Sequence, residues 1–362
     1  MKHQDILRAG TSIWLDDLSR SKLTGSDSHS LPHRITHDGV RGVTTNPSIF
    51  GAAIVGADEY AADIASLSGK SVDEVVRTLT TDDVRVACDL FADIYKGSNG
   101  IDGRVSIEVD PRLAHKTQET IEEGVALHAL VGRPNVMIKV PATKAGLPAI
   151  TALIGKGISV NVTLIFSLER YGEVIDAFST GMEQAKNAGL DLASIHSVAS
   201  FFISRIDSAV DKELKAVGNT ELLGKVAVAN AHRAYALFLD KFNQASWTSL
   251  EAHGALVQRP LWASTGVKDP AYPDTLYVDT LIAPHTVNTM PQSTLDAFLD
   301  HGKVNPESIT AELANAERVL KELAALGISL EKITAALEAD GVKKFEEAWI
   351  SLLADVEKVM AQ

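Results

Sequence analysis

The sequence predicts a closed (β/α)8 barrel, the TIM-barrel architecture, with additional helices at its C-terminal end. Short β-branched runs alternate with amphipathic helical patterns, which is typical of a parallel sheet joined by crossover helices. Eight such strand runs fall between residues 12 and 285, and eight favour a closed barrel over an open sheet. No low-complexity linker divides the 362 residues, so we expect one domain over residues 1–362.

The expected strands share a core of apolar, mostly β-branched residues between turn-forming residues. They cover residues 12–17, 42–46, 104–110, 136–141, 159–166, 197–202, 260–265 and 276–283. Helical patterns between them cover residues 81–95, 112–130, 167–188 and 221–245. Thr81, Asp82 and Asp83 supply an N-cap and an acidic first turn to the first of these helices.

Two segments depart from this alternation. Residues 26–39 are rich in Ser, His, Asp and Pro, which predicts a surface loop. From about residue 286 the pattern is helical only. We therefore expect the barrel strands to end by residue 285, and residues 286–362 to form helices that pack on the outside or the bottom of the barrel.

Composition narrows the function classes. The formal charge is −13 and the isoelectric point is about 5.3, which weighs against nucleic acid as a partner. An anionic ligand would need a local cluster of Arg or Lys. The N-terminus leads into no apolar segment, and no run approaches the ~20 apolar residues of a membrane span, so we expect a cytoplasmic protein. The single cysteine, Cys88, excludes an intrachain disulfide, and its helical spacing to apolar neighbours predicts burial.

Lys139 is the most informative residue, because it stands in the otherwise apolar strand expected at residues 136–141. Side chains alternate along a strand, so Met137 and Lys139 point to one side of the sheet. If helices cover this strand, the amine projects into a protected interior. A desolvated lysine favours its neutral, nucleophilic form, which condenses with a carbonyl to a Schiff base. A lysine whose amine reaches solvent at the strand end is the structural alternative.

Polar residues recur near the C-terminal ends of the expected strands, where functional residues of such barrels lie. They occupy the minority face of otherwise apolar strands and include Asp16, Asn46, Ser106, Glu108, Asp110, Asn161, Thr163, Ser200 and Ser264. Any one of them could be an internally satisfied polar group. Because six strands share the pattern, it favours a polar site at the barrel mouth.

A lysine that faces carboxylates in a barrel favours Schiff-base carbonyl chemistry. The lysine attacks a ketone, a carboxylic acid relays the protons that let water leave, and a carboxylate removes a hydroxyl proton so that a C–C bond breaks. The protonated imine takes up the electron pair, so the reaction needs no metal and no organic cofactor. The eleven histidines show no metal-ligand spacing, and we expect His285 to be structural.

Four ordered segments resemble the motifs of the transaldolase family. They are residues 42–50 (GVTTNPSIF), 105–110 (VSIEVD), 138–143 (IKVPAT) and 161–167 (NVTLIFS). Residues 14–20 and 260–291 look like the long transaldolases of actinobacteria and cyanobacteria. The resemblance covers essentially the whole chain, and four motifs in strand context are far more specific than one pattern match.

The resemblance implies a class I enzyme of the pentose phosphate pathway. Such an enzyme moves a dihydroxyacetone unit from sedoheptulose 7-phosphate to glyceraldehyde 3-phosphate, giving erythrose 4-phosphate and fructose 6-phosphate. By position, Lys139 corresponds to the Schiff-base nucleophile and Asp16 to the acid/base on the C4 hydroxyl. Glu108 handles protons during imine formation and hydrolysis, with Thr163 holding a water. Three further positions correspond to residues that hold the hydroxyls of the triose unit: Asn46, Asn161 and Ser200.

The phosphate site is where the chain departs from the better-known family pattern. Arg205 and Ser264 match family phosphate-binding positions. The better-known members carry an arginine two residues after that serine, whereas this chain has Gly266 there, and Lys268 is the nearest cation. A lysine neutralises phosphate but lacks the guanidinium fork that binds two oxygens in one plane.

Two alternatives remain at this stage. One is an enzyme similar to fructose-6-phosphate aldolase, with the same lysine chemistry but protonation of the enamine or use of free dihydroxyacetone. The other is a non-catalytic sugar-phosphate-binding barrel, which would have no need of the Asp16, Glu108 and Lys139 trio. In each case we expect sugar phosphates as ligands, no nucleic acid or membrane partner, and a monomer or homodimer.

Overall fold

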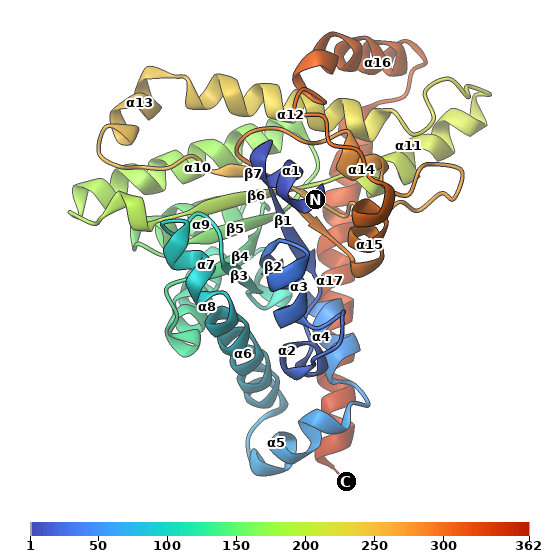
Figure 1. The fold of residues 1–362 in the computed structure, drawn as a ribbon. Helices are drawn as coiled ribbons and strands as arrows, with labels where there is room; N and C mark the ends of the chain where they lie inside the picture. The colour runs from blue at the N-terminus through green and yellow to red at the C-terminus, as the bar shows by residue number, and fades with distance from the viewer. Residues whose placement is uncertain (1, 362) are drawn as a thin grey trace.

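Eight parallel strands form a closed barrel in chain order in the computed structural model, which describes residues 2–361 (Figure 1). The strands are β1 (Thr11–Asp16), β2 (Val40–Thr44), β3 (Arg104–Glu108), β4 (Val136–Pro141), β5 (Val160–Ile165), β6 (Ser197–Phe202), β7 (Arg259–Ala263) and β8 (Thr286–Met290). The prediction of a (β/α)8 barrel is confirmed. Seven of the eight predicted strands coincide with observed strands to within two residues at each end.

Helices follow the strands around the outside of the barrel. The α-helices are α1 (Lys2–Arg8), α2 (Arg20–Thr24), α3 (Leu31–His37), α4 (Pro47–Ile54), α5 (Ala61–Ser66), α6 (Val72–Leu90), α7 (Ala92–Gly97), α8 (Thr117–Val131), α9 (Gly146–Gly155), α10 (Leu168–Asn187), α11 (Ser204–Ala216), α12 (Val226–Phe242), α13 (Ala245–Glu251), α14 (Leu276–Asp279), α15 (Gln292–His301), α16 (Leu313–Ala325) and α17 (Leu330–Met360). Four 3-10 turns complete the set: η1 (Asp58–Tyr60), η2 (Pro111–Leu113), η3 (Leu192–Ser194) and η4 (Thr310–Glu312). None of the helices described is long and apolar enough to cross a bilayer.

The strand register sets which polar side chains meet at the barrel mouth. Glu108 of β3 lies opposite Lys139 of β4, and Lys139 lies opposite Asn161 of β5. Two residues further along, Pro141 pairs with Thr163. Residues in register lie side by side on adjacent strands, so these side chains are neighbours within the barrel.

Close packing of aromatic and branched side chains stabilises the barrel wall. Trp14 of β1 is fully buried, and its indole lies against Gly42 of β2, where an added Cβ would come within 2.5 Å of the ring. Gly42 is therefore required by the close approach of the two strands. Cys88 of α6 is buried, as its spacing predicted.

The predicted eighth strand is wrong. Residues 276–283 begin with the short helix α14, and β8 instead spans Thr286–Met290, so the barrel strands extend beyond residue 285. The 276–283 segment is apolar because it packs into the core: Tyr277 and Val278 are buried, and the Tyr277 hydroxyl donates to Asp207. A short apolar run does not distinguish a strand from such a packed segment.

Two helix predictions also need correction. The expected loop at residues 26–39 contains α3, which begins after Ser30 with Pro32 in its first turn. The helix predicted to begin at Thr81 begins at Val72, after a capping box formed by Ser71 and Glu74. Both observed starts carry a recognised N-terminal signal, which is Pro32 in the first turn of α3 and the Ser71–Glu74 capping box of α6.

The C-terminal helices are not confined to the outside or bottom of the barrel. α16 packs on the outer helix α12, but α17 runs past the barrel as one long helix beside α4 and α11 (Figure 1). Along this path Gly341 lies against Leu164 and Arg205, and Phe345 lies over Lys139. The last helix therefore covers the C-terminal mouth, where the polar residues gather.

Candidate active site

Lys139 is held in the barrel interior, with only 5% of its side chain exposed. Its Nζ donates a 2.8 Å hydrogen bond to the Thr45 carbonyl and lies 3.2 Å from Oε2 of Glu108. The Phe345 ring from α17 covers it, with its centroid 5.6 Å from Nζ. These contacts fix the position of a buried amine, whose hydrogen bond and ion pair are provided by the ends of β2 and β3.

Glu108 is as buried as its partner. Burial raises the pKa of its carboxyl to about 7; the Lys139 ammonium opposes this rise, and the Asp16 carboxylate adds to it. A carboxyl with a pKa near neutrality both donates and accepts protons at physiological pH. The position suits an acid/base group directly beside the amine.

Asp16 lies at the end of β1, on the cavity that contains Lys139. The hydroxyl of Thr44 donates a 2.8 Å hydrogen bond to Oδ1 of Asp16 and lies 2.7 Å from the Thr289 hydroxyl. The neighbouring Asp17 is instead ion-paired with Lys22. The structure therefore separates the two aspartates, and only Asp16 has the setting of a site residue.

The hydroxyls of Ser200 and Thr163 line the other side of the cavity, and the Asn161 amide lies behind Ser200. Asn161 donates to the Ser106 hydroxyl at 3.0 Å and accepts from the Ser200 hydroxyl at 2.7 Å. The hydroxyl of Thr163 is buried and finds no hydrogen-bond partner within residues 2–361. Asn46 caps α4 by accepting from the Ile49 amide at 3.0 Å, which fixes its side chain at the cavity wall.

Arg205 supplies the positive charge of the cavity. It stands in the first turn of α11, and its guanidinium carbon lies 5.3 Å from the centre of the Phe202 ring. Burial lowers the pKa of Arg205, while Asp340 and Asp16 oppose this effect. One buried guanidinium nitrogen, Nη1, has no hydrogen-bond partner in the described part of the chain. A buried cation with an unused donor suits an anionic ligand group.

The cavity has a free volume of about 70 Å3. It is lined by Asp16, Thr44, Asn46, Lys139, Thr163, Ser200, Phe202, Arg205, Ala263, Ser264, Thr289 and Phe345. Seven of the predicted site residues therefore line one space, and Glu108 and Asn161 join it through direct contacts with Lys139 and Ser200. The Ser264 hydroxyl lies 2.9 Å from that of Ser204, at the start of α11.

Two residues weighed from the sequence lie elsewhere. Lys268 lines an open depression together with Lys212 and Lys215, apart from the cavity that contains Lys139. His285 precedes β8 rather than following the last strand, and it lines a hollow with His196 and Arg259 at the opposite end of the barrel. The charge of Lys268 is therefore not directed at the cavity.

Five residues that line the cavity were not assigned to the site from the sequence: Thr44, Phe202, Ala263, Thr289 and Phe345. Thr44 and Phe202 lie two residues from Asn46 and Ser200 respectively, so the alternation of side chains could have indicated them. Thr289 lies on β8, whereas the eighth strand was predicted at residues 276–283, so Thr289 was not expected on a strand. Phe345 carries no local signal, because only the path of α17 across the mouth brings it to Lys139.

A buried lysine, a carboxyl that titrates near neutrality and a second, separate carboxylate in one (β/α)8 barrel define a protein built for Schiff-base chemistry on a carbonyl compound. The family described as transaldolase/fructose-6-phosphate aldolase matches residues 13–356. The chain belongs to this family.

Curated relatives agree over nearly the whole length. The chain is 54% identical over 353 residues to the transaldolase of Mycobacterium tuberculosis, covering 96% of this chain and 94% of the relative. It is 57% identical over 352 residues to transaldolase 1 of Streptomyces avermitilis, covering 96% of this chain and 92% of the relative. Transaldolase 1 of Streptomyces coelicolor is 55% identical over 360 residues, covering 98% and 94%. These relatives confirm the resemblance to the actinobacterial transaldolases.

Proposed function

We propose that the chain is a transaldolase. It transfers a dihydroxyacetone unit from sedoheptulose 7-phosphate to glyceraldehyde 3-phosphate, giving erythrose 4-phosphate and fructose 6-phosphate in the pentose phosphate pathway. The observation that carries the proposal is the buried Lys139–Glu108 pair with Asp16 on the same cavity, in a chain of the transaldolase family.

Lys139 and Glu108 perform imine formation. The neutral amine attacks the ketone carbon, and Glu108 gives a proton to the resulting hydroxyl so that water leaves. The 3.2 Å contact between Nζ and Oε2 supports this pairing, since a proton can pass between these groups without movement of either strand. The unpartnered Thr163 hydroxyl supports its role as the group that holds the water.

Asp16 performs the C–C bond step. Its carboxylate removes the proton of the C4 hydroxyl, the C3–C4 bond breaks, and the electron pair passes into the protonated imine. The hydrogen bond from Thr44 supports this role because it orients one carboxylate oxygen and leaves the other for substrate. Asn46, Asn161 and Ser200 bind the hydroxyls of the triose unit.

Arg205 and Ser264 bind the phosphate. The unused guanidinium donor of Arg205 and the placement of Ser264 on the cavity support this assignment. The prediction that Lys268 contributes stays a prediction, and its position in a separate depression gives it no support.

The aldolase alternative differs from this proposal only in the fate of the enamine. The family's own description covers both activities, and Lys139, Glu108 and Asp16 serve both. A non-catalytic sugar-phosphate-binding barrel remains the third interpretation. The proposal further comprises a cytoplasmic enzyme that acts as a monomer or homodimer without nucleic-acid partners. The buried free thiol supports the cytoplasmic compartment, and the charge of −13 supports the lack of nucleic-acid partners.

Product analysis tests the proposed function. The purified chain is incubated with fructose 6-phosphate, with and without erythrose 4-phosphate. We expect sedoheptulose 7-phosphate and glyceraldehyde 3-phosphate only when erythrose 4-phosphate is present, and no products from Lys139→Ala. Free dihydroxyacetone released at the same rate without an acceptor would establish the aldolase alternative instead, and a lack of turnover with both would support the binding barrel.

A further inference from the structure

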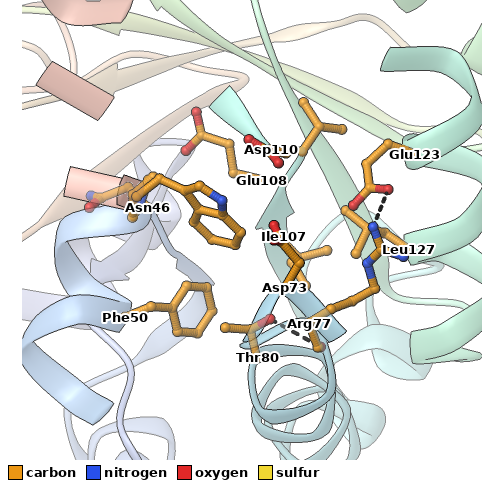
Figure 2. A pocket seen from close by; sticks show the side chains of 13 residues that line it. Asn46, Phe50, Asp73, Arg77, Thr80, Ile107, Glu108, Asp110, Glu123 and Leu127 are labelled. Atoms are coloured by element: carbon orange, nitrogen blue, oxygen red, sulfur yellow. Dashed lines mark hydrogen bonds and ion pairs between the residues drawn. The ribbon is translucent and has the colours of Figure 1, made fainter. Parts of the chain in front are cut away.

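A second crevice reaches Glu108 from the side away from the sugar cavity. It lies between the end of β3 and the helices α4, α6, α8 and α17. Its walls include Phe50, Thr80, Leu127 and Trp349, and Figure 2 shows Glu108 and Asn46 on one side of it and the Arg77–Glu123 ion pair on the other. Its free space accommodates about one water molecule and no sugar.

Glu108 and Asn46 separate this crevice from the cavity that contains Lys139. Glu108 lines the crevice, Lys139 lines the sugar cavity, and Asn46 lines both. The amine and the carboxylate therefore touch each other, although Glu108 also lines the crevice and Lys139 does not. A small molecule in the crevice has direct access to Glu108 without passing through the mouth.

The crevice has the polar lining that water requires. The indole Nε1 of Trp349 is a buried donor that no acceptor in residues 2–361 satisfies. Arg77 pairs with Glu123 at 2.9 Å, and Arg112 pairs with both Asp110 and Asp73 nearby. Ordered water binds where it has two or more polar partners, and Trp349 and Glu108 offer a donor and an acceptor at the inner end.

The proposed reaction creates a need for such a space. In imine formation Glu108 gives its proton to the carbinolamine hydroxyl, the C2–O bond breaks, and the nitrogen lone pair forms the C=N bond. The oxygen leaves as water, and hydrolysis runs the same events in reverse with one water consumed. The ketose phosphate meanwhile extends from Lys139 toward Arg205 and fills the space between the imine carbon and the mouth.

We propose that the crevice behind Glu108 is the route by which this water leaves and enters while the sugar occupies the mouth. This inference rests on the proposed Schiff-base function. Leu127 and Thr80 make it narrow, and the Trp349 indole binds the water on its way between Glu108 and solvent. The reaction thereby exchanges one water molecule with solvent while α17 stays in place over the mouth.

Oxygen exchange tests the route. The substrate is fructose 6-phosphate with 18O at C2, and mass spectrometry follows loss of the label to solvent. Borohydride trapping measures the Schiff base formed in parallel. Each cycle of imine formation releases the label as water, so the ratio of exchange to trapping reports how often that water escapes before it adds back. Lys139→Ala sets the background.

Leu127→Phe narrows the crevice from α8, and Thr80→Met narrows it from α6. Two variants are used so that the test survives if one of them fails to fold. Leu250→Phe on α13 is the matched control, because Leu250 and Leu127 are both 3% exposed and Leu250 does not line the crevice. The crevice variants and the control all add side-chain volume at buried positions, so Leu250→Phe corrects for the general effect of overpacking.

We expect Leu127→Phe and Thr80→Met to lower the exchange-to-trapping ratio by about tenfold, while early trapping stays within about twofold of the wild type. Leu250→Phe leaves the ratio unchanged. An unchanged ratio in both crevice variants, with normal trapping, overturns the route but leaves the Schiff-base function intact. Failure of the wild type to trap any Schiff base overturns the proposed function itself, and the route with it.

Discussion

Replacement of Glu108 by glutamine tests the electrostatics of the site through the stability of the fold. Burial raises the pKa of this carboxyl from its ordinary 4.5 to about 7. Between these two pH values the folded protein keeps the proton and the unfolded chain releases it. Stability from this group is therefore fully present below about pH 4.5 and is lost as the pH rises through about 7.

At about 1.4 kcal/mol for each pH unit between the two values, the loss amounts to about 3 kcal/mol. Urea unfolding of the wild type and of Glu108→Gln at a series of pH values from 4 to 8 measures it. Titrating groups that do not interact with Glu108 act equally in both proteins and cancel in the difference. We expect the free energy of unfolding of the wild type, relative to that of the variant, to fall by about 3 kcal/mol as the pH rises across this range. A difference that stays constant with pH, or grows as the pH rises, refutes the reasoning.

The other replacements separate the steps of the reaction. Asp16→Ala should still form the trapped Schiff base but lose C–C bond cleavage by about 10²–10⁴-fold, whereas Asp17→Ala should keep most activity because Asp17 pairs with Lys22. Stopped-flow measurement of product release distinguishes the two variants, and the reverse pattern contradicts the choice of Asp16. Arg205→Ala should raise KM for glyceraldehyde 3-phosphate by about one to two decades, because one charge-assisted contact with the phosphate is lost, and should have little effect on KM for glyceraldehyde. Equal effects on both acceptors would show that Arg205 has a structural role. Phe345→Leu should raise the release of free dihydroxyacetone relative to transfer, because the Phe345 ring shields Lys139 from water. An unchanged ratio of free dihydroxyacetone to transfer product in a product assay counts against this shielding.

The barrel and most of its site follow from local sequence signals. The β4 segment alternates Met137 and Lys139 against valine and isoleucine, and this alternation gives both the strand and the inward direction of the amine. The register of Glu108 with Lys139 follows once the strands are ordered along the chain. Parallel strands in sequence order leave few alternative neighbours, which is why polar strand ends predicted a shared site.

The remaining features depend on packing between distant segments. The apolar 276–283 segment has the composition of a strand, and only the tertiary contacts of Tyr277 show that it is a packed turn and short helix. Phe345 reaches Lys139 because α17 crosses the mouth, where Gly341 allows the close approach to Arg205 and Leu164. Lys268 follows β7 by only a few residues, yet the chain turns it toward Lys212 and Lys215. Charge and spacing in the sequence do not encode these directions.

Reductive trapping tests the covalent role of Lys139 most directly. The protein is mixed with fructose 6-phosphate and borohydride, digested, and mapped by mass spectrometry. If Lys139 has this covalent role, we expect one stable dihydroxyacetone-derived or hexose-derived adduct on Lys139 alone, and none in Lys139→Ala. An adduct on Lys144 or Lys268 with Lys139 unmodified, or no adduct in an enzyme that catalyses transfer, would contradict it.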